Sequence, residues 1–208
     1  MTAGCAVLDV GSGRHPAIPA DQRPADVRYV GLDVSAEELA AAESGAYTES
    51  VAADATHLQP NLVGQFDLVI SWQVLEHVRD LPETISHVHK YLRPGGTFVA
   101  LFSGGFSVFA IANRVLPNKL GSRIVDPIMR RSANNRPVFP AFYDKCYDRA
   151  LKKIFAPWQS ANIVPLFQGA NYFGFSAIAQ RGYLAYENFI ARRRVADLAT
   201  HYLVIAST

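Results

Sequence analysis

Three aspartates each end a short apolar run, in an arrangement suited to holding a nucleoside. Asp9 precedes the turn Gly11-Ser12-Gly13, and Asp33 follows Gly13 by 20 residues. Glycines let the backbone approach a ligand closely, and an acid at the second strand end can accept hydrogen bonds from both ribose hydroxyls. Asp54, at the end of a third run, could accept from an exocyclic adenine amine. A turn or helix cap explains any one of them, but the set of three indicates a nucleoside-containing ligand.

Histidines supply the candidate general bases. His77 is the first candidate, because it is expected one helical turn past the fourth apolar run, at the same edge as the aspartates. His15, beside the glycine turn, is the second candidate, and His57 is the third. His87 is expected to be exposed, opposite the apolar stripe of its helix. The remaining histidines, His89 and His201, are expected to be structural.

Gln73, Glu76 and His77 stand at i, i+3 and i+4 and are expected to share one helix face. Glutamine is a poorer ligand than a carboxylate for a hard cation. We therefore predict no metal site. The alternative to catalysis is that Glu76 and His77 hydrogen-bond to fix their helix against the glycine turn.

Apolar runs alternate with helical patterns, and this alternation predicts how the site residues are positioned. Helices are expected after Ser35 and Asp80, because each has a glutamate three positions later and forms a capping box. The second of these helices is expected to end at Pro94-Gly95-Gly96. Uniformly apolar runs are typical of parallel strands covered on both faces. The expected strands are residues 7–10, 28–33, 49–54, 66–71, 97–102, 160–167 and 201–206.

The fold class predicted is therefore α/β, with one doubly wound domain over residues 1–208. Residues 1–102 would form the half that binds the nucleoside. Residues 103–158 are rich in Phe, Arg and Pro and are expected to form a mostly helical insertion after the fifth strand. Residues 159–208 would supply the last two strands, with one or two amphipathic helices at 174–195 between them.

Composition excludes several classes of protein. With 50% hydrophobic and 18% charged residues among 208, the chain is neither disordered nor low in complexity. Its two cysteines, Cys5 and Cys146, make no disulfide framework, and the start resembles no export signal, so a cytoplasmic location is expected. The uncharged stretches 94–113 and 154–180 contain Pro and Gly and are not expected to cross a membrane.

The net charge of +2 is unevenly distributed. Residues 1–100 carry six Lys/Arg and thirteen Asp/Glu, whereas residues 101–208 carry fourteen and five. The basic half could attract a phosphate-bearing small molecule or an anionic lipid surface, or could simply be a solvated surface. No nucleic-acid recognition motif is visible. The basic clusters, set among many aromatic residues, are Arg130-Arg131, Lys152-Lys153 and Arg192-Arg193-Arg194.

The motifs around these residues resemble class I S-adenosylmethionine-dependent methyltransferases over nearly the whole chain. The segments at 66–78 and 91–99 are similar to the small-molecule branch of that superfamily. The resemblance implies a Rossmann-like, seven-stranded, mostly parallel sheet with an antiparallel last strand. The matching segments are VLDVGSG at 7–13, YVGLD at 29–33, ADA at 53–55, FDLVISWQVLEHV at 66–78 and YLRPGGTFV at 91–99.

The same resemblance implies a set of contacts with S-adenosylmethionine. Gly11, Ser12 and Gly13 would pass under the methionine part of the cofactor, and Asp9 would help to position its amino acid moiety. Asp33, with Val34 beside it, would hold the ribose. The other implied contacts are Asp54 and Ala55 at the adenine, and Ser71 and Trp72 near the sulfonium.

Two departures from the family pattern bear on the site. His15 stands where the family usually has a third glycine. Most relatives have one or two helices before the first strand that cover the site, whereas this chain begins about five residues before it. We therefore expect residues 103–158, or a partner, to provide the cover, with a hinge at Ser103-Gly104-Gly105.

The resemblance implies methyl transfer to a small-molecule, lipid or glycan acceptor, with O-methylation favoured and His77 as the candidate base. Peripheral contact with an anionic inner membrane face is a further expectation, and the oligomeric state is left open. One alternative is a protein that binds S-adenosylmethionine without turnover. The other is a nicotinamide-dependent oxidoreductase, against which Pro16 counts, because that class would have glycine there.

Overall fold

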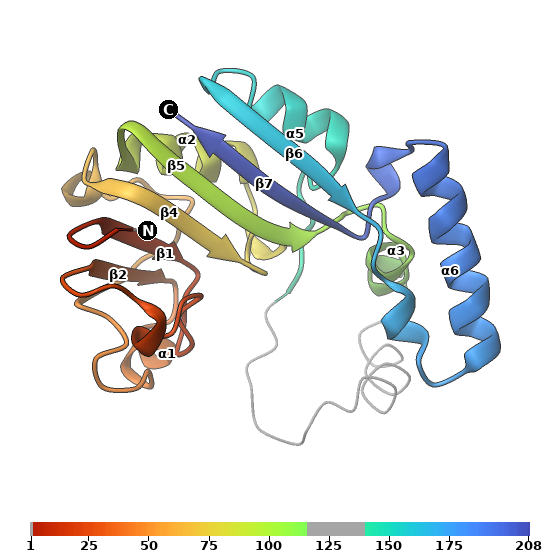
Figure 1. Ribbon diagram of the computed structural model, residues 1–208, viewed down its shortest axis with the longest axis horizontal. Helices are drawn as coiled ribbons and strands as arrows, with labels where there is room; N and C mark the ends of the chain where they lie inside the picture. The colour runs from red at the N-terminus through yellow and green to blue at the C-terminus, as the bar shows by residue number, and fades with distance from the viewer. Residues whose placement is uncertain (1, 116–139) are drawn as a thin grey trace.

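The computed structural model describes residues 2–115 and 140–208, and residues 1 and 116–139 lie outside the described part. It contains a seven-stranded sheet with the strand order β3-β2-β1-β4-β5-β7-β6 (Figure 1). The strands are β1 (Ala6–Val10), β2 (Arg28–Asp33), β3 (Glu49–Ala52), β4 (Phe66–Trp72), β5 (Leu92–Ser103), β6 (Ser160–Leu166) and β7 (His201–Ser207).

Strand directions confirm the predicted fold class. β1 pairs in parallel with β2 and β4, β2 with β3, and β4 with β5. β7 is antiparallel to both of its neighbours, β5 and β6. The parallel pairs bring the carboxyl ends of β1 to β4 to one edge of the sheet, where the predicted site residues lie.

The predicted strands agree with the structure to within two residues, except for β5. This strand begins at Leu92, five residues before the expected start, and it includes Pro94-Gly95-Gly96. The pairing register shifts between Phe66 and Leu68 of β4, and Gly95 adopts φ +79°. The Pro-Gly-Gly sequence therefore forms an irregular strand start rather than a connecting turn.

Both predicted capping boxes start helices. The hydroxyl of Ser35 accepts the backbone N–H of Glu38 at 3.1 Å and begins α1 (Ala36–Ala40). The carboxylate of Asp80 accepts the N–H of Glu83 at 3.0 Å and begins α2 (Leu81–Tyr91). The other described helices are α3 (Val108–Val115), α5 (Asp148–Ile154) and α6 (Ala177–Arg192).

The main hydrophobic core lies on one face of the sheet. Helices α2 and α5 lie behind the strands in the view of Figure 1. They contribute Ile85, Val88 and Leu151, which pack with Phe98 of β5 and Val204 of β7. These five side chains are almost completely buried.

The opposite face of the sheet is covered in part by a loop. A small cluster of Val7, Tyr29 and Ile70 is covered by Ala17 and Ile18, which belong to the loop after β1. Over β4, β5 and β7, no described helix lies on this face (Figure 1). This part of the face therefore lacks a helix among the described residues, because the segment after β1 is a loop, whereas α1 packs against β2 and β3.

The segment after β5 contains α3 and α5, and the central residues 116–139 of the predicted insertion 103–158 fall outside the described part. Arg130-Arg131 and part of the predicted cover over the site belong to these residues. The predicted helical region 174–195 contains one helix, α6, whose first turn is capped by the hydroxyl of Ser176. In the described ranges no helix is both long enough and apolar enough to cross a membrane.

Candidate functional site

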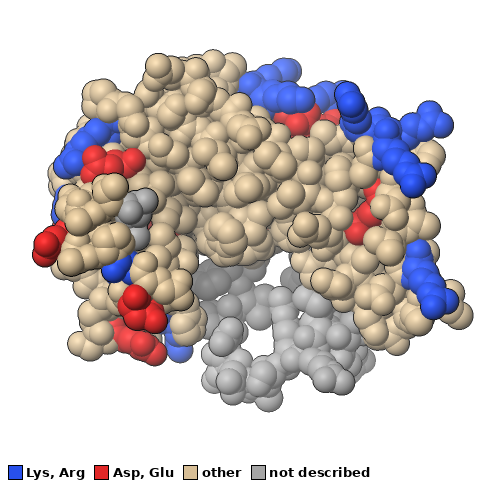
Figure 2. All heavy atoms as spheres, viewed as in Figure 1, with Lys and Arg blue, Asp and Glu red and all other residues tan. Residues whose placement is uncertain are grey.

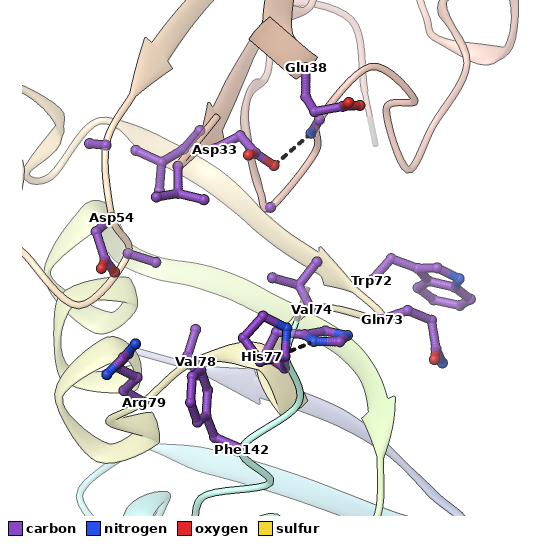
Figure 3. Close-up of a pocket in the computed structure, with 17 residues that line it drawn as sticks. Asp33, Glu38, Asp54, Trp72, Gln73, Val74, His77, Val78, Arg79 and Phe142 are labelled. Carbon is purple, nitrogen blue, oxygen red and sulfur yellow. Dashed lines mark hydrogen bonds between the residues drawn. The ribbon is translucent and has the colours of Figure 1, made fainter. Parts of the chain in front are cut away.

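A cavity of about 500 Å³ opens at the carboxyl edge of the sheet (Figure 3). This volume falls within the ~300–1,000 Å³ that is usual for small-molecule sites. Residues from the ends of β1, β2, β3 and β4 form most of it, and Pro140 and Phe142 close one side. The lining consists of Gly11, Gly13, Leu32, Asp33, Val34, Glu38, Ala53, Asp54, Ala55, Trp72, Gln73, Val74, His77, Val78, Arg79, Pro140 and Phe142.

The glycine turn and Asp33 are joined directly. The backbone N–H of Gly13 donates to Oδ2 of Asp33 at 2.9 Å, and the N–H of Ser35 donates to Oδ1 at 2.9 Å. A carboxylate oxygen can accept more than one hydrogen bond, so Asp33 keeps acceptor capacity toward the cavity that it lines. This position suits an acceptor of ribose hydroxyls.

Gly11 is required for a packing reason that the motif alone does not reveal. It adopts φ +77°, and a Cβ built there would lie 2.3 Å from Cγ1 of Val74. Val74, which follows β4, therefore packs against the glycine turn. The turn is held from two sides, by Asp33 at Gly13 and by Val74 at Gly11.

Asp54 lies at the part of the cavity formed by the end of β3. Its Oδ1 accepts the backbone N–H of Thr56 at 2.9 Å and the hydroxyl of Thr56 at 2.8 Å. The backbone hydrogen bond from Thr56 is the main cause that holds the pKa of Asp54 below its usual range. Asp54 is thus a carboxylate at neutral pH, flanked by the apolar side chains of Ala53 and Ala55.

Three of the predicted cofactor residues lie behind the cavity rather than on its wall. Asp9 is buried, and its Oδ2 accepts the N–H of Ala17 and the hydroxyl of Tyr29, both at 2.7 Å. Ser71 is buried and donates to the carbonyl oxygen of Val10 at 3.1 Å. Ser12 is also buried. The lining set does not contain these three side chains, so they support the glycine turn and the loop after it.

Burial makes the carboxylate form of Asp9 less favourable at neutral pH. Its burial raises the pKa of the carboxyl to about 6, even though the hydrogen bonds from Tyr29 and Ala17 act in the opposite direction. Arg23 also favours the charged form. Asp9 therefore holds the loop after β1 while titrating near the lower end of the physiological pH range.

His77 and Trp72 lie at the other end of the cavity from Asp33 (Figure 3). The imidazole Nδ1 of His77 lies 3.1 Å from the carbonyl oxygen of Pro140. If Nδ1 carries the proton and donates to that oxygen, the lone pair of the neutral ring is on Nε2. Trp72, which ends β4, is 50% exposed beside it. A proton acceptor and an aromatic side chain thus border the cavity together.

The expectation that Gln73, Glu76 and His77 share one helix face is wrong. Gln73 has φ +58° and lies outside the helix, and Leu75–His77 form a single 3-10 turn. Gln73 and His77 line the cavity, whereas Glu76 is buried and accepts the hydroxyl of Ser103 at 2.8 Å. Glu76 therefore ties this turn to the end of β5.

The other histidines are placed as follows. His15 and His57 are exposed and are absent from the cavity lining, so neither candidate base reaches it. His87 was expected to be exposed, but it is buried, with Nε2 2.8 Å from Glu83 and Nδ1 3.4 Å from the Ala55 carbonyl oxygen. Within the described residues, no three side chains of metal-binding type come together.

Arg79 and Phe142 are among the lining residues that were not predicted from the sequence. The guanidinium carbon of Arg79 lies 4.8 Å from the centre of the Phe142 ring, and both side chains border the cavity near Asp54. Arg79 directly follows the matching segment 66–78, so its place near the site could have been expected. Phe142 is more than 60 residues away along the chain, and no local pattern indicates its contact.

Comparison with known proteins gives matches in the region of the site. Residues 8–100 match the family described as "Methyltransferase domain". A ubiquinone biosynthesis O-methyltransferase of Pseudomonas paraeruginosa is 37% identical over 100 residues, which cover 45% of this chain and 42% of the relative. The human mitochondrial protein named arginine-hydroxylase NDUFAF5 is 30% identical over 105 residues, which cover 50% of this chain and 30% of that protein.

Solved structures agree on the fold. An S-adenosylmethionine-dependent methyltransferase from Archaeoglobus fulgidus is similar with a TM-score of 0.56 at 17% identity, covering 99% of this chain and 87% of that chain. Residues 8–100, which form most of the site, thus resemble the methyltransferase domain, and the chain as a whole has the fold of this solved methyltransferase. The chain spans about half the length, or less, of the first curated relatives that it matches.

Proposed function

We propose that the protein binds S-adenosylmethionine in the cavity at the carboxyl edge of the sheet and transfers its methyl group to a small-molecule acceptor. The observation that carries this proposal is the convergence of Gly13, Asp33, Asp54 and His77 on one cavity. Two carboxylates at adjacent strand ends suit the ribose and the adenine, and His77 borders the remaining space.

The cavity fits the chemistry of this cofactor. Asp33 retains acceptor capacity for ribose hydroxyls. Leu32, Val34 and Val78 supply apolar walls on which a purine can pack. S-adenosylmethionine would supply an electrophilic methyl group on a sulfonium. The acceptor would attack this methyl group in line with the carbon–sulfur bond, and S-adenosylhomocysteine would be the leaving group. The protein then mainly contributes alignment and exclusion of water.

We favour a hydroxyl acceptor. A neutral hydroxyl must lose its proton on methylation, and a base near the cavity assists this step. His77 can accept the proton on Nε2 if Nδ1 donates to the carbonyl oxygen of Pro140. The O-methyltransferases among the relatives support the same choice, although the acceptor class, which includes lipid and glycan alcohols, is our proposal.

Isothermal titration calorimetry with S-adenosylmethionine, S-adenosylhomocysteine and NAD⁺ tests the cofactor. We expect binding of the first two and none of NAD⁺. Binding of NAD⁺ alone would favour the oxidoreductase alternative and overturn the proposal. The Asp33→Ala variant serves as the control for binding in this cavity.

Product analysis distinguishes a methyltransferase from a protein that binds S-adenosylmethionine without turnover. One relative is named a hydroxylase, so methyl transfer itself has to be measured and not only binding of the cofactor. Incubation with methyl-labelled S-adenosylmethionine and a panel of phenols, catechols and sugar alcohols should transfer label to one of them. Binding of the cofactor with no transfer to any hydroxyl, amine or carbon acceptor would favour the binding protein.

A further inference from the structure

The outward face of α6 has an unusual composition for a helix on the surface of a globular protein. Such a helix normally buries its apolar residues and presents charged residues of both signs to water. In α6, Ile178 is 85% exposed and Phe189 is 58% exposed. With Gly182 and Ala185, they stand at spacings of four, three and four residues and so form one stripe.

The inward face of α6 holds its only acidic residue. Glu187 is 2% exposed and accepts the backbone N–H of Gly169 at 2.7 Å and the hydroxyl of Thr200 at 2.8 Å. Tyr183 and Ile190 are buried beside it. The outward face is therefore left with no negative charge of its own.

Four arginines flank the apolar stripe, and all four are exposed. In the described part of the chain, no carboxylate forms an ion pair with any of them. The guanidinium carbon of one, Arg193, lies 5.5 Å from the centre of the Phe189 ring, so charge and apolar surface are presented together. Figure 2 shows Lys and Arg side chains gathered over α5 and α6. The four residues are Arg181, Arg192, Arg193 and Arg194.

We propose that α6 docks in the plane of an anionic lipid surface, with the stripe Ile178–Phe189 entering the boundary between headgroups and acyl chains. A convex apolar stripe bordered by basic residues has the geometry of an interfacial helix, which lies on a bilayer and does not span it. The arginines complement the phosphates of acidic lipids.

The positive charge around the stripe argues against a second copy of the chain as its binding partner. Two copies packed through this stripe would bring the four arginines of each copy to one interface, where no exposed carboxylate of α6 offsets them, and like charges would repel. An anionic surface is attracted by the same four residues. This inference does not depend on cofactor binding, so it can fail or succeed independently of the proposed function.

Vesicle flotation of the full chain tests the inference. We expect flotation with vesicles of phosphatidylcholine mixed with phosphatidylglycerol, no flotation with phosphatidylcholine alone, and a strong decrease at high salt. Ile178→Asp should lower the partition coefficient about tenfold. Arg193→Gln should lower it about fivefold, since one arginine near such a surface contributes that factor.

Two matched variants control for charge and exposure elsewhere. Val63→Asp replaces another exposed aliphatic side chain, distant from α6 in the chain, and Lys90→Gln removes another exposed positive charge. Both should float like the wild type, and circular dichroism should show that all variants are folded. Absent flotation, equal flotation on neutral vesicles, or equal loss in the controls would overturn the proposal. A dimer in light scattering that Ile178→Asp dissociates would assign the stripe to a second copy instead.

Discussion

The carboxylate of Asp33 accepts the backbone N–H of Gly13 at 2.9 Å, across a sequence separation of 20 residues. This bond makes the end of β2 part of the glycine turn. Asp33 therefore has two roles, because it faces the cavity and also fixes the loop that forms the cavity floor. Substitutions at this position must separate the two roles.

Asp33→Ala should weaken S-adenosylmethionine binding by about 1–3 kcal/mol, because two ribose hydroxyls lose their acceptor. It should also lower thermal stability, since the N–H groups of Gly13 and Ser35 lose theirs. Asp33→Asn keeps one side-chain oxygen as an acceptor. It should therefore lose a smaller share of the thermal stability of the wild type than of its affinity for S-adenosylmethionine. Calorimetry and thermal unfolding measure the two quantities, and unchanged affinity in a folded Asp33→Ala protein contradicts the assignment.

Gly11→Ala should destabilise the protein by about 1–3 kcal/mol, because alanine disfavours φ +77° and its Cβ would overlap Val74. Val74→Ala in the same chain should recover part of the loss by removing the overlap. Urea unfolding of the two single variants and the double variant gives the coupling energy. Strict additivity would show that the two residues do not touch in solution.

Asp9 should make stability depend on pH in the acid range. Its folded-state pKa is about 6 against an ordinary value of 3.8, because of burial, so between these values the folded protein keeps a proton that the unfolded chain releases. The free energy of unfolding should therefore fall as pH rises through this window, by about 1–3 kcal/mol, and stay lower above it. Asp9→Asn should lack this component. Asp21→Asn, at an exposed position, should behave like the wild type in the same urea titrations.

His77→Ala should lower turnover by about 10²–10⁴-fold with cofactor affinity retained, if His77 removes the acceptor proton. His77→Asn, whose side-chain amide nitrogen takes the place of Nδ1, can still donate to the Pro140 carbonyl oxygen and should preserve the local structure without restoring turnover. Label transfer and calorimetry on both variants test this expectation. Loss of thermal stability and of cofactor affinity together would instead assign His77 a structural role.

Adjacent residues of β7 test whether one sheet face is uncovered. Val204 is 0% exposed under α2 and α5, whereas Ile205 is 42% exposed on the other face. Val204→Thr should cost about 1–3 kcal/mol, because it buries a hydroxyl. Ile205→Thr should cost less than about 1 kcal/mol. A comparable loss at Ile205, measured by urea unfolding, would mean that this face is covered in solution.

Much of the fold was predictable because buried parallel strands are short apolar runs that end at glycine or aspartate, as at Val10 and Leu32. The start of β5 was not, because Pro94-Gly95-Gly96 is typical of a turn and its place in the sheet depends on pairing with β4. The exposure of His87 was predicted wrongly, since its hydrogen-bonding partner is the carbonyl oxygen of a residue 32 positions away.

The site was predictable to the extent that each residue type had one plausible use. Asp33 and Asp54 line the cavity as the motif implies. Asp9 belongs to the same motif, but its partners Tyr29 and Ala17 turn it into the core, and no spacing rule reveals those contacts. Burial of Glu76 likewise depends on Ser103, at the end of another strand.

The antiparallel direction of β7 has a practical consequence for handling the protein. Val7 pairs with Leu68, Leu68 with Thr97, and Thr97 with Ser207, so the start of β1 and the end of β7 share one row of the sheet. Three strand spacings separate them, about 14 Å. This row lies near the amino ends of β1 and β4, the edge opposite the cavity. An affinity tag or a surface tether attached next to the start of β1 or the end of β7 would therefore leave the cavity mouth open.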